Sequence, residues 1–353
     1  MAAPKATANT DIRVDLYSDT HSLPTQPMRQ AMANAECGDE QQSADPTTNR
    51  LQEMVAELLG KDAAVYLPSG TMCNEIAYRV WCRQGDEIIM DKTGHGFNFE
   101  TGGPAALSGA LCYPLDGDLG IFTADQVRAA IRGASRHQPR SRVLNVENTA
   151  NLGGGRIWPL ERIAEVTSVA KEHGLACHMD GARLMNAVVA SGIAAKDFAA
   201  PFDSVWIDLS KGLGCPIGGV LAGGADFIEE AFRCKHQFGG AMRQSGIIAA
   251  AGVYALEHNV ERLAEDHANA AAMAHGLSGI KGIRLQNDTI ETNLVFFDVS
   301  GTGLSAPEIS ARVAEKGVAI GAMSDTMLRA VTHLDVDRAG IDEAVQAVAD
   351  AVG

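Results

Sequence analysis

Short apolar runs alternate with helix-forming segments through residues 63–223, and this alternation constrains the fold more than any other feature of the chain. Each run has the length and the bounding turn residues of a buried strand. Strands that alternate with helices form a mostly parallel sheet covered by helices on both faces. The sequence therefore predicts an α/β fold with strands within residues 64–67, 87–90, 107–115, 142–147, 174–180, 205–209 and 218–222.

Helix starts are marked by familiar capping residues. Asp45 and Pro46 are typical of a helix start, and apolar residues recur behind them at helical spacing. Pro27 indicates an earlier helix in the same way. Thr123 with Gln126 forms the pattern of a capping box and predicts another helix.

The two ends of the chain differ from this central region. Residues 1–10 predict a disordered tip, and residues 244–276 predict an alanine-rich helical stretch that links two domains. The tail predicts strands at 293–298 and 327–331 and amphipathic helices at 305–316 and 338–351. From a chain of 353 residues we expect an N-terminal segment (1–60), a large domain (61–250) and a smaller C-terminal α+β domain (251–353).

Composition argues against several classes of partner. The formal net charge is −15 and no basic run interrupts it, so nucleic acids and anionic membranes are poor partners. The sequence lacks an apolar run of about 18 residues that would span a membrane, and residues 1–10 lack the apolar core of a signal peptide. The seven cysteines contain no Cys-x-x-Cys pair, which predicts unpaired thiols in a reducing, cytoplasmic setting and no metal site.

Two of the predicted strands end in residues that suit one cofactor. Lys211 follows the apolar stretch 205–209 and precedes glycines, and Asp180 ends the stretch 174–180. A lysine amine forms a Schiff base with an aldehyde, and a buried carboxylate keeps a pyridine nitrogen protonated. Together they predict a pyridoxal phosphate site. The alternative for either residue is an ordinary position in a surface turn.

Further polar residues follow other predicted strands. Ser69, Gly70 and Thr71 stand between a strand and a helix, where backbone N–H groups and hydroxyls suit a phosphate; an ordinary helix cap has the same pattern. His95 follows the next strand and suits both stacking on a pyridine ring and proton transfer. Because ligands bind at the carboxyl ends of parallel strands, we expect these side chains to converge there.

The order of these motifs resembles that of the low-specificity L-threonine aldolases, over roughly residues 11–350. Members of that family are fold-type-I pyridoxal phosphate enzymes, usually homotetramers with active sites shared between subunits. They cleave β-hydroxy-α-amino acids to glycine and an aldehyde. The motifs that carry the resemblance are Asp15-x-x-Ser-Asp-Thr20, Asp45-Pro-Thr-x-Asn-Arg-Leu51, Ser69-Gly-Thr-Met-x-Asn74, Glu147-Asn-Thr149, His178-x-Asp-Gly-Ala-Arg183, Leu209-Ser-Lys-Gly-Leu-Gly214, Gly239-Gly-x-Met-Arg-Gln244 and Val331-Thr-His-Leu-Asp335.

The resemblance implies a role for each matching residue. Lys211 would hold the cofactor, Asp180 would pair with its ring nitrogen, and His95 would stack on the ring. Polar and basic residues from several motifs would bind the phosphate, the ring hydroxyl and the substrate carboxylate. For the phosphate these are Ser69, Gly70, Thr71 and, from a neighbouring subunit, Arg243; for the hydroxyl or the carboxylate they are Ser18, Arg183 and Arg329.

Three positions depart from the family pattern. Gln42 and Ala44 stand where the family has a tyrosine and a glutamate, and Ala150 stands where it has a histidine that contacts the substrate hydroxyl. Alanine neither accepts a proton nor donates a hydrogen bond. Either His95 or a water molecule then serves as the base, or the reaction differs.

Three functions therefore stay open at this point. The first is a retro-aldolase that acts on a β-hydroxy-α-amino acid. The second keeps the cofactor but removes only the α-proton or a β-substituent, which would make the chain an amino acid racemase or a β-eliminating lyase. The third is a catalytically inactive homologue that binds the cofactor or a partner, against which the intact Lys211 and Asp180 argue.

Overall fold

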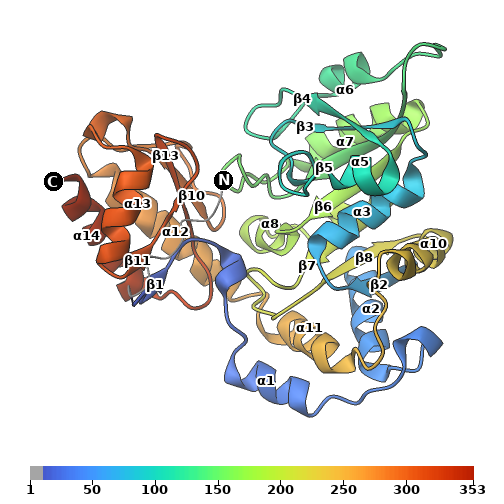
Figure 1. The fold of residues 1–353 in the computed structure, drawn as a ribbon, viewed down its shortest axis with the longest axis horizontal. Helices are drawn as coiled ribbons and strands as arrows, with labels where there is room; N and C mark the ends of the chain where they lie inside the picture. Colours follow the sequence, from blue (N-terminus) through green and yellow to red (C-terminus); the bar gives the residue numbers. More distant parts are fainter. Residues whose placement is uncertain (1–10) are drawn as a thin grey trace. The chain divides into compact units, whose positions relative to one another are not determined.

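A seven-stranded sheet lies at the centre of the larger of two compact units in the computed structural model, which describes residues 11–353. The strand order is β2-β8-β7-β6-β5-β3-β4 (Figure 1). β8 is antiparallel to both of its neighbours, and every other adjacent pair is parallel. The strands are β2 (Ala63–Leu67), β3 (Asp86–Asp91), β4 (Leu111–Leu115), β5 (Arg140–Glu147), β6 (Ala176–Gly181), β7 (Ser204–Asp208) and β8 (Gly219–Gly223).

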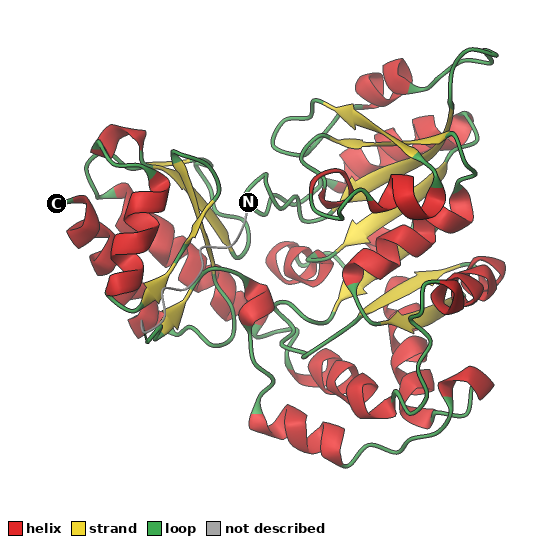
Figure 2. Cartoon of the chain, viewed as in Figure 1, coloured by secondary structure: helices red, strands yellow, loops and turns green. Residues whose placement is uncertain are grey.

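Helices cover both faces of this sheet, so the predicted α/β fold is confirmed (Figure 2). α3 packs with α5 and α10 on one face, and α2, α9, α7 and α6 pack in succession on the other. α1 and α11 pack together, and α11 lies against α2. These helices, with the short α4 and α8, are α1 (Gln26–Ala33), α2 (Pro46–Leu59), α3 (Gly70–Trp81), α4 (His95–Asn98), α5 (Gly103–Ser108), α6 (Ala124–Ala130), α7 (Leu160–Glu172), α8 (Leu184–Ser191), α9 (Ala195–Ala199), α10 (Ala225–Gln237) and α11 (Gly246–His258).

The predicted helix starts are confirmed by their hydrogen bonds. The side chain of Asp45 accepts from the backbone N–H of Thr48 at the start of α2. At the start of α6, Thr123 and Gln126 bond reciprocally to each other's backbone N–H groups as a capping box. Local capping chemistry thus sets where these helices begin.

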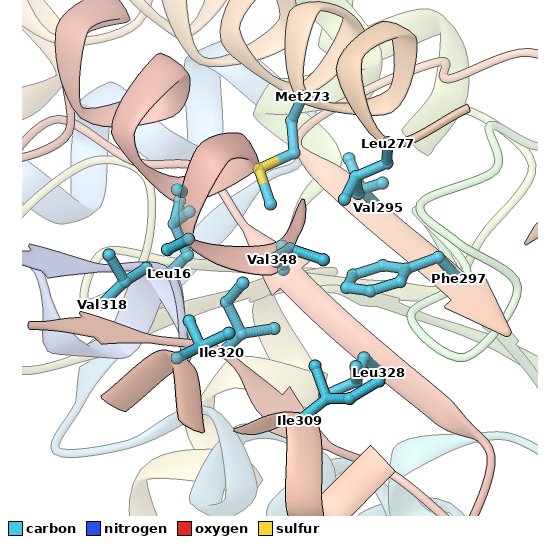
Figure 3. Close-up of a cluster of buried hydrophobic side chains, with 14 of the residues drawn as sticks. Leu16, Met273, Leu277, Val295, Phe297, Ile309, Val318, Ile320, Leu328 and Val348 are labelled. Atoms are coloured by element: carbon cyan, nitrogen blue, oxygen red, sulfur yellow. The ribbon is translucent and has the colours of Figure 1, made fainter. Parts of the chain in front are cut away.

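The second compact unit combines residues 11–23 with residues 261–353. Its antiparallel sheet has the order β12-β13-β10-β9, and β1 pairs in parallel with β11. Three helices pack with these strands around one apolar core, part of which is shown in Figure 3. The elements are β1 (Val14–Asp15), α12 (Leu263–Ser278), β9 (Arg284–Leu285), β10 (Leu294–Asp298), α13 (Ala306–Glu315), β11 (Val318–Ala319), β12 (Gly321–Ala322), β13 (Met327–Val331) and α14 (Arg338–Val352).

Several boundaries differ from the expected ones. The units are 24–260 and 11–23 with 261–353, whereas the expected division was 1–60, 61–250 and 251–353; the expectation for residues 1–10 lies outside the described residues. The helical stretch at 244–276 is two helices, one in each unit. The predicted strand within 107–115 occupies only its second half, because α5 ends at Ser108. These differences arise from tertiary pairing, which local sequence patterns do not report.

A fully buried ion pair joins two distant segments of the larger unit. The Nζ atom of Lys235, in α10, lies 2.6 Å from Oε1 of Glu40, and both side chains are almost inaccessible to solvent. The other oxygen of Glu40 accepts from the hydroxyl of Ser245, and Oε1 also accepts from the backbone N–H of Met242. The pair therefore anchors the loop that precedes α2 to the loop that precedes α11.

Removal of one partner should destabilise the fold strongly, because it leaves the other charge buried without compensation. We expect Lys235→Met to lower the free energy of unfolding by about 3–5 kcal/mol. The double variant Lys235→Met with Glu40→Leu should recover part of that loss. Urea denaturation measures both, and an exposed control, Lys171→Met, should stay within about 0.5 kcal/mol of the parent. Equal stability of Lys235→Met and the parent chain would contradict the anchoring role.

Candidate active site

Polar side chains follow five strands at the carboxyl edge of the larger sheet. Because β2, β3, β5, β6 and β7 run in the same direction, the residues behind them lie along one edge. The fold therefore places these sequence-predicted residues in a row. They are Ser69 after β2, Lys211 after β7, Asp180 at the end of β6, Glu147 at the end of β5 and His95 after β3.

Lys211 is held against a carboxylate and an indole. Its Nζ atom lies 2.8 Å from Oδ2 of Asp208 and 5.8 Å from the ring centre of Trp206, and its side chain is 15% exposed. Asp208, the last residue of β7, also accepts hydrogen bonds from the backbone N–H and the hydroxyl of Ser210. The amine is thus ordered, partly accessible and paired with a carboxylate.

Asp180 lies one strand away from Lys211 and is 1% exposed. Its Oδ2 accepts from Nδ2 of Asn74 at 2.8 Å, and its Oδ1 accepts from the backbone N–H of Ala182 at 3.1 Å. Burial raises the pKa of Asp180, and the nearby His95 and Lys211 oppose that effect. A buried carboxylate whose pKa is raised by burial is suited to a further cationic partner, which would lower it again.

His95 is oriented by two carboxylates. Its Nδ1 lies 2.8 Å from Oε1 of Glu100, and its backbone N–H donates to Oε2 of Glu147 at 2.7 Å. Burial by itself lowers the pKa of His95, but the hydrogen bond to Glu100 and the charges around the ring outweigh it, so the pKa is raised overall. Since Nδ1 is occupied by Glu100, Nε2 is the nitrogen that can face a ligand.

A buried chain of hydrogen bonds supports Asp180 from behind. Trp81 Nε1 donates to the Ser204 hydroxyl at 3.0 Å, which lies 2.8 Å from Nδ1 of His178. Nε2 of His178 lies 3.1 Å from Oδ1 of Asn74, and Nδ2 of Asn74 donates to Asp180. Because the carboxylate of Asp180 only accepts, Asn74 donates to it through Nδ2 and its Oδ1 accepts from Nε2 of His178. Burial lowers the pKa of His178 to about 3, so the ring is neutral with its proton on Nε2, and Nδ1 accepts from the Ser204 hydroxyl.

Asn74 has four partners and so fixes several groups at once. Its Oδ1 also accepts from Trp206 Nε1 at 2.7 Å, and its Nδ2 also donates to Oε1 of Glu100 at 2.7 Å. Asn74 therefore links the support of Asp180 to the carboxylate that orients His95. The sequence prediction included Asn74 only within a motif and assigned it no role.

The segment Ser69-Gly70-Thr71 opens α3 beside Trp206. The Ser69 hydroxyl accepts from the backbone N–H of Met72, and both Ser69 and Thr71 are exposed. A Cβ atom on Gly70 would lie 2.2 Å from Cη2 of the Trp206 ring, so only glycine fits at this position. The turn thus combines exposed hydroxyls, a helix N-terminus and close backbone approach, which are the features that suit a phosphate.

Ala150 is 2% exposed and lies beneath a tight turn. The turn contains Leu119 and Gly120, both with positive φ, and Asp118 is paired with Arg156 at 3.0 Å. A Cβ on Gly120 would lie 2.7 Å from the Cβ of Ala150, so the turn leaves no gap there. The position where the resemblance places a histidine is therefore covered by backbone.

Glu147 stands beside this enclosed position. Its Oε1 accepts from the backbone N–H of Asn151 at 2.8 Å. Burial raises the pKa of Glu147 to about 7, and the nearby charge of Asp180 acts in the same direction. A carboxyl group with such a pKa can both hold and release a proton near neutral pH.

The remaining sequence-predicted residues are less closely tied to this row. Arg183 is buried at the start of α8, two residues after β6. Arg243 is exposed and lies 2.9 Å from Asp39. Ser18 and Arg329 belong to the other compact unit, where Ser18 caps a short 3-10 helix and Nη2 of Arg329 donates to the carbonyl of Tyr17. The expected roles of these four residues in binding cofactor or substrate stay predictions.

Glu75, Glu100 and Asp208 are functional candidates that sequence reasoning missed or left without a role. A carboxylate three residues before the lysine was visible in the sequence, since Asp208 lies in an otherwise apolar strand. Glu75, in a helix, and Glu100, in a loop, had no comparable signal, because glutamates are ordinarily exposed. Among residues 11–353, no cluster of three or more His, Cys, Asp or Glu side chains is arranged to hold a metal ion. No helix in the described part of the chain is long and apolar enough to cross a membrane.

His178 should make stability fall in mild acid. Burial lowers the pKa of His178 to about 3 from 6.5, so between these values the unfolded chain binds a proton that the folded chain does not. Stability should therefore fall as the pH falls through this range, by up to about 1.4 kcal/mol per pH unit for this group. Urea denaturation from pH 6.5 to pH 4.5 should show a shallower loss for His178→Asn than for the parent chain. The exposed control His137→Asn should keep the parental slope, and parallel curves for all three proteins would refute the neutral, buried His178.

The sequence matches known proteins along most of its length. The profile of the family described as beta-eliminating lyase matches residues 15–300. A low-specificity L-threonine aldolase of Escherichia coli is 41% identical over 331 residues, which covers 94% of this chain and 96% of the relative. A low-specificity L-threonine aldolase of Arabidopsis thaliana is 39% identical and covers 91% of each chain.

Solved structures of similar fold include two from the same group of enzymes. A crystal structure of a putative L-allo-threonine aldolase from Listeria monocytogenes has a TM-score of 0.80 at 22% identity and covers 97% of both chains. A threonine aldolase of Leishmania major has a TM-score of 0.82 at 21% identity and covers 96% of this chain and all of the other. These structures share the fold of a mostly parallel sheet flanked by helices. On the sequence matches, the chain belongs to the beta-eliminating lyase family, and its relatives there include low-specificity L-threonine aldolases.

Proposed function

We propose that this chain is a pyridoxal phosphate-dependent aldolase that cleaves a β-hydroxy-α-amino acid of the threonine type to glycine and an aldehyde. The observation that carries the proposal is the placement of Lys211 and Asp180 at the ends of adjacent parallel strands. The similarity to low-specificity L-threonine aldolases over more than nine tenths of the chain supports the choice of reaction. Fold-type-I neighbours such as serine palmitoyltransferase, solved with the cofactor, support the choice of cofactor.

The residues present fit pyridoxal phosphate. When bound, this cofactor supplies an electron sink for the pair released as a bond at the α-carbon breaks. Lys211 would hold its aldehyde carbon, and Asp180 would accept a hydrogen bond from its ring nitrogen. The start of α3 at Ser69, Gly70 and Thr71 would bind its phosphate, with Arg243 of a neighbouring copy, while Arg183 would bond to its ring hydroxyl.

We assign the individual proton transfers to different residues of the chain. The ion pair with Asp208 holds the Lys211 amine in place and offers a carboxylate that can take up a proton from it. Nε2 of His95 is the atom proposed to accept the proton of the β-hydroxyl, because Nδ1 is bonded to Glu100. Glu147, adjacent to His95, is placed to exchange a proton with the same region. We assign the substrate carboxylate to Arg183, Ser18 and Arg329.

Ala150 bears on which residue removes the proton from the β-hydroxyl group of the substrate. The turn at Leu119 and Gly120 covers Ala150. Neither a polar side chain nor bulk water is therefore available at this position to accept the hydroxyl proton. We therefore assign the base to His95, with Glu147 as its neighbour. The alternative is a racemase or a β-eliminating lyase on the same scaffold, which needs no group for the hydroxyl; the absence of a polar group at Ala150 is the observation that keeps it in view.

We further propose that the protein is a cytoplasmic homotetramer with shared active sites. The support is the family resemblance and the exposed Arg243, whose expected phosphate partner would belong to another copy. Light scattering on the purified holoenzyme tests the assembly, and a monomer would contradict it.

Lys211→Ala should abolish aldehyde release. Aldehyde should be measured from L-threonine, L-allo-threonine, both D isomers and phenylserine, with Lys171→Ala, an exposed lysine of α7, as the matched control. The parent chain and the control should release aldehyde from an L isomer, and Lys211→Ala should fall to the background rate because it lacks the amine. No release from any substrate by the cofactor-loaded parent would refute the aldolase, and deuterium exchange at the α-carbon of alanine would then test the racemase.

Asp180→Asn should keep the cofactor but lose most of the rate. The amide has the same shape as the carboxylate and cannot stabilise a protonated ring nitrogen, so kcat should fall by about 10²- to 10³-fold. Cofactor absorbance at saturation checks binding, and the exposed Asp197→Asn is the control. A variant with parental kcat would remove Asp180 from the catalytic set.

A further inference from the structure

Two carboxyl groups lie side by side in the interior behind His95. Glu75 belongs to α3 and is 1% exposed, and Glu100 follows α4 and is 5% exposed. Three of their four carboxyl oxygens, both of Glu75 and Oε2 of Glu100, are buried without a hydrogen-bond partner in the described part of the chain, and Glu100 acts to raise the pKa of Glu75. Two ionised carboxylates can only accept, so this buried pair can form a hydrogen bond only if one of the two groups carries a proton.

The surroundings supply donors to only one oxygen of the pair. Oε1 of Glu100 accepts from Asn74 Nδ2 at 2.7 Å and faces His95 Nδ1 at 2.8 Å. Within residues 11–353, no group donates a hydrogen bond to Oε2 of Glu100 or to either oxygen of Glu75. Gly103 closes the far side, since a Cβ there would lie 2.1 Å from Oε1 of Glu75. A second ionised carboxylate at this place would have neither water nor a donor to stabilise it.

The titratable groups that face the pair do not offer a permanent cation. His95 is the group among them that can carry a positive charge, and within the pair its ring contacts Glu100 through Nδ1. Burial raises the pKa of Glu75 to about 9, and the adjacent Glu100 acts in the same direction. The other titratable side chains whose electrostatic interactions reach Glu75 or Glu100 are Cys73 and Tyr78 from α3, Cys112 from β4 and Asp180 from β6.

We propose that Glu75 is a positioning residue that keeps one proton between itself and Glu100, and that this shared proton sets how tightly Glu100 holds the proton of His95. The hydroxyl of Glu75 donates to Glu100 and draws negative charge away from the oxygen that faces His95. His95 then releases its proton more easily than it would beside a bare buried carboxylate. The link to turnover rests on the proposed function, in which His95 is the base; the shared proton itself does not.

Glu75→Gln separates the protonated from the ionised form of Glu75. An amide has nearly the same shape and still donates to Glu100, so if Glu75 already carries the proton the pKa of His95 should be unchanged. If Glu75 is ionised, the amide removes a negative charge and the pKa of His95 should fall, which would overturn the proposal. The measurement is an NMR titration of histidine-labelled holoenzyme without substrate, with the His95 signal assigned from His95→Gln and the exposed Glu53→Gln as the control.

Glu75→Leu, or Glu75→Met if the first variant folds poorly, tests the donor itself. Without the hydroxyl, charge concentrates on Glu100 and the pKa of His95 should rise by about one pH unit. The acid limb of kcat/KM for aldehyde release should move to higher pH by the same amount, and Glu75→Gln should leave it in place. An unchanged pKa of His95 in the apolar variant would show that Glu75 acts only in packing and would overturn the proposal.

Stability provides a readout that is independent of catalysis. The folded chain holds a proton on Glu75 that the unfolded chain loses above about pH 4.5, so the parent chain should lose stability as the pH rises toward 9. Glu75→Gln has no such proton to lose, and its melting temperature relative to the parent should rise over this range. If aldehyde release fails for every substrate while the NMR and melting results hold, the proposed function falls and the shared proton stands.

Discussion

The amide of Asn74 is the interaction on which the site depends. It accepts from His178 and Trp206 and donates to Asp180 and Glu100, and all of these groups are buried or nearly so. A buried polar network of this kind specifies one arrangement only when each member is satisfied, because an unpaired group costs free energy in a low dielectric. Here the direction of donation is set at both ends, by an indole that can only donate and by carboxylates that can only accept. The network therefore orients the site before any ligand arrives.

Acidic side chains concentrate around this network. Asp180, Glu147, Glu100, Glu75 and Asp208 all lie near the carboxyl edge of the sheet or behind it, and Lys211 and His95 are among the cationic groups that interact with them. Burial raises the pKa values of Asp180, Glu147 and Glu75, which is the expected response of carboxyl groups removed from water. Perturbed carboxyl groups clustered at one edge of a sheet are typical of a site that moves protons. A cationic ring nitrogen beside Asp180 would offset part of this charge.

The departure at Ala150 has a structural counterpart. The tight turn at Leu119 and Gly120 packs on Ala150, and the ion pair between Asp118 and Arg156 holds that turn. The loss of a polar side chain at this position is thus accompanied by closure of the space. In the proposed function, Nε2 of His95 and the neighbouring Glu147 therefore take the place of a polar group at Ala150. The relatives named as low-specificity L-threonine aldolases are 41% and 39% identical over more than nine tenths of the chain, so the departure at Ala150 stands within a chain that is otherwise similar along most of its length.

The sequence by itself determined the alternation of strands and helices, the helix starts at Asp45 and Thr123, and the candidates Lys211, Asp180, Ser69 and His95, because periodicity, capping and strand-end chemistry are local signals. It did not reveal that residues 11–23 join the C-terminal unit or that the stretch at 244–276 is divided between two units, since both depend on pairing between distant segments. Only the tertiary structure decided the partners of the site. Glu100 and Glu75 look like ordinary exposed glutamates in the sequence, and Asn74 like an ordinary motif residue. Their roles exist only where α3, α4 and the ends of the strands meet and exclude water from the space between them.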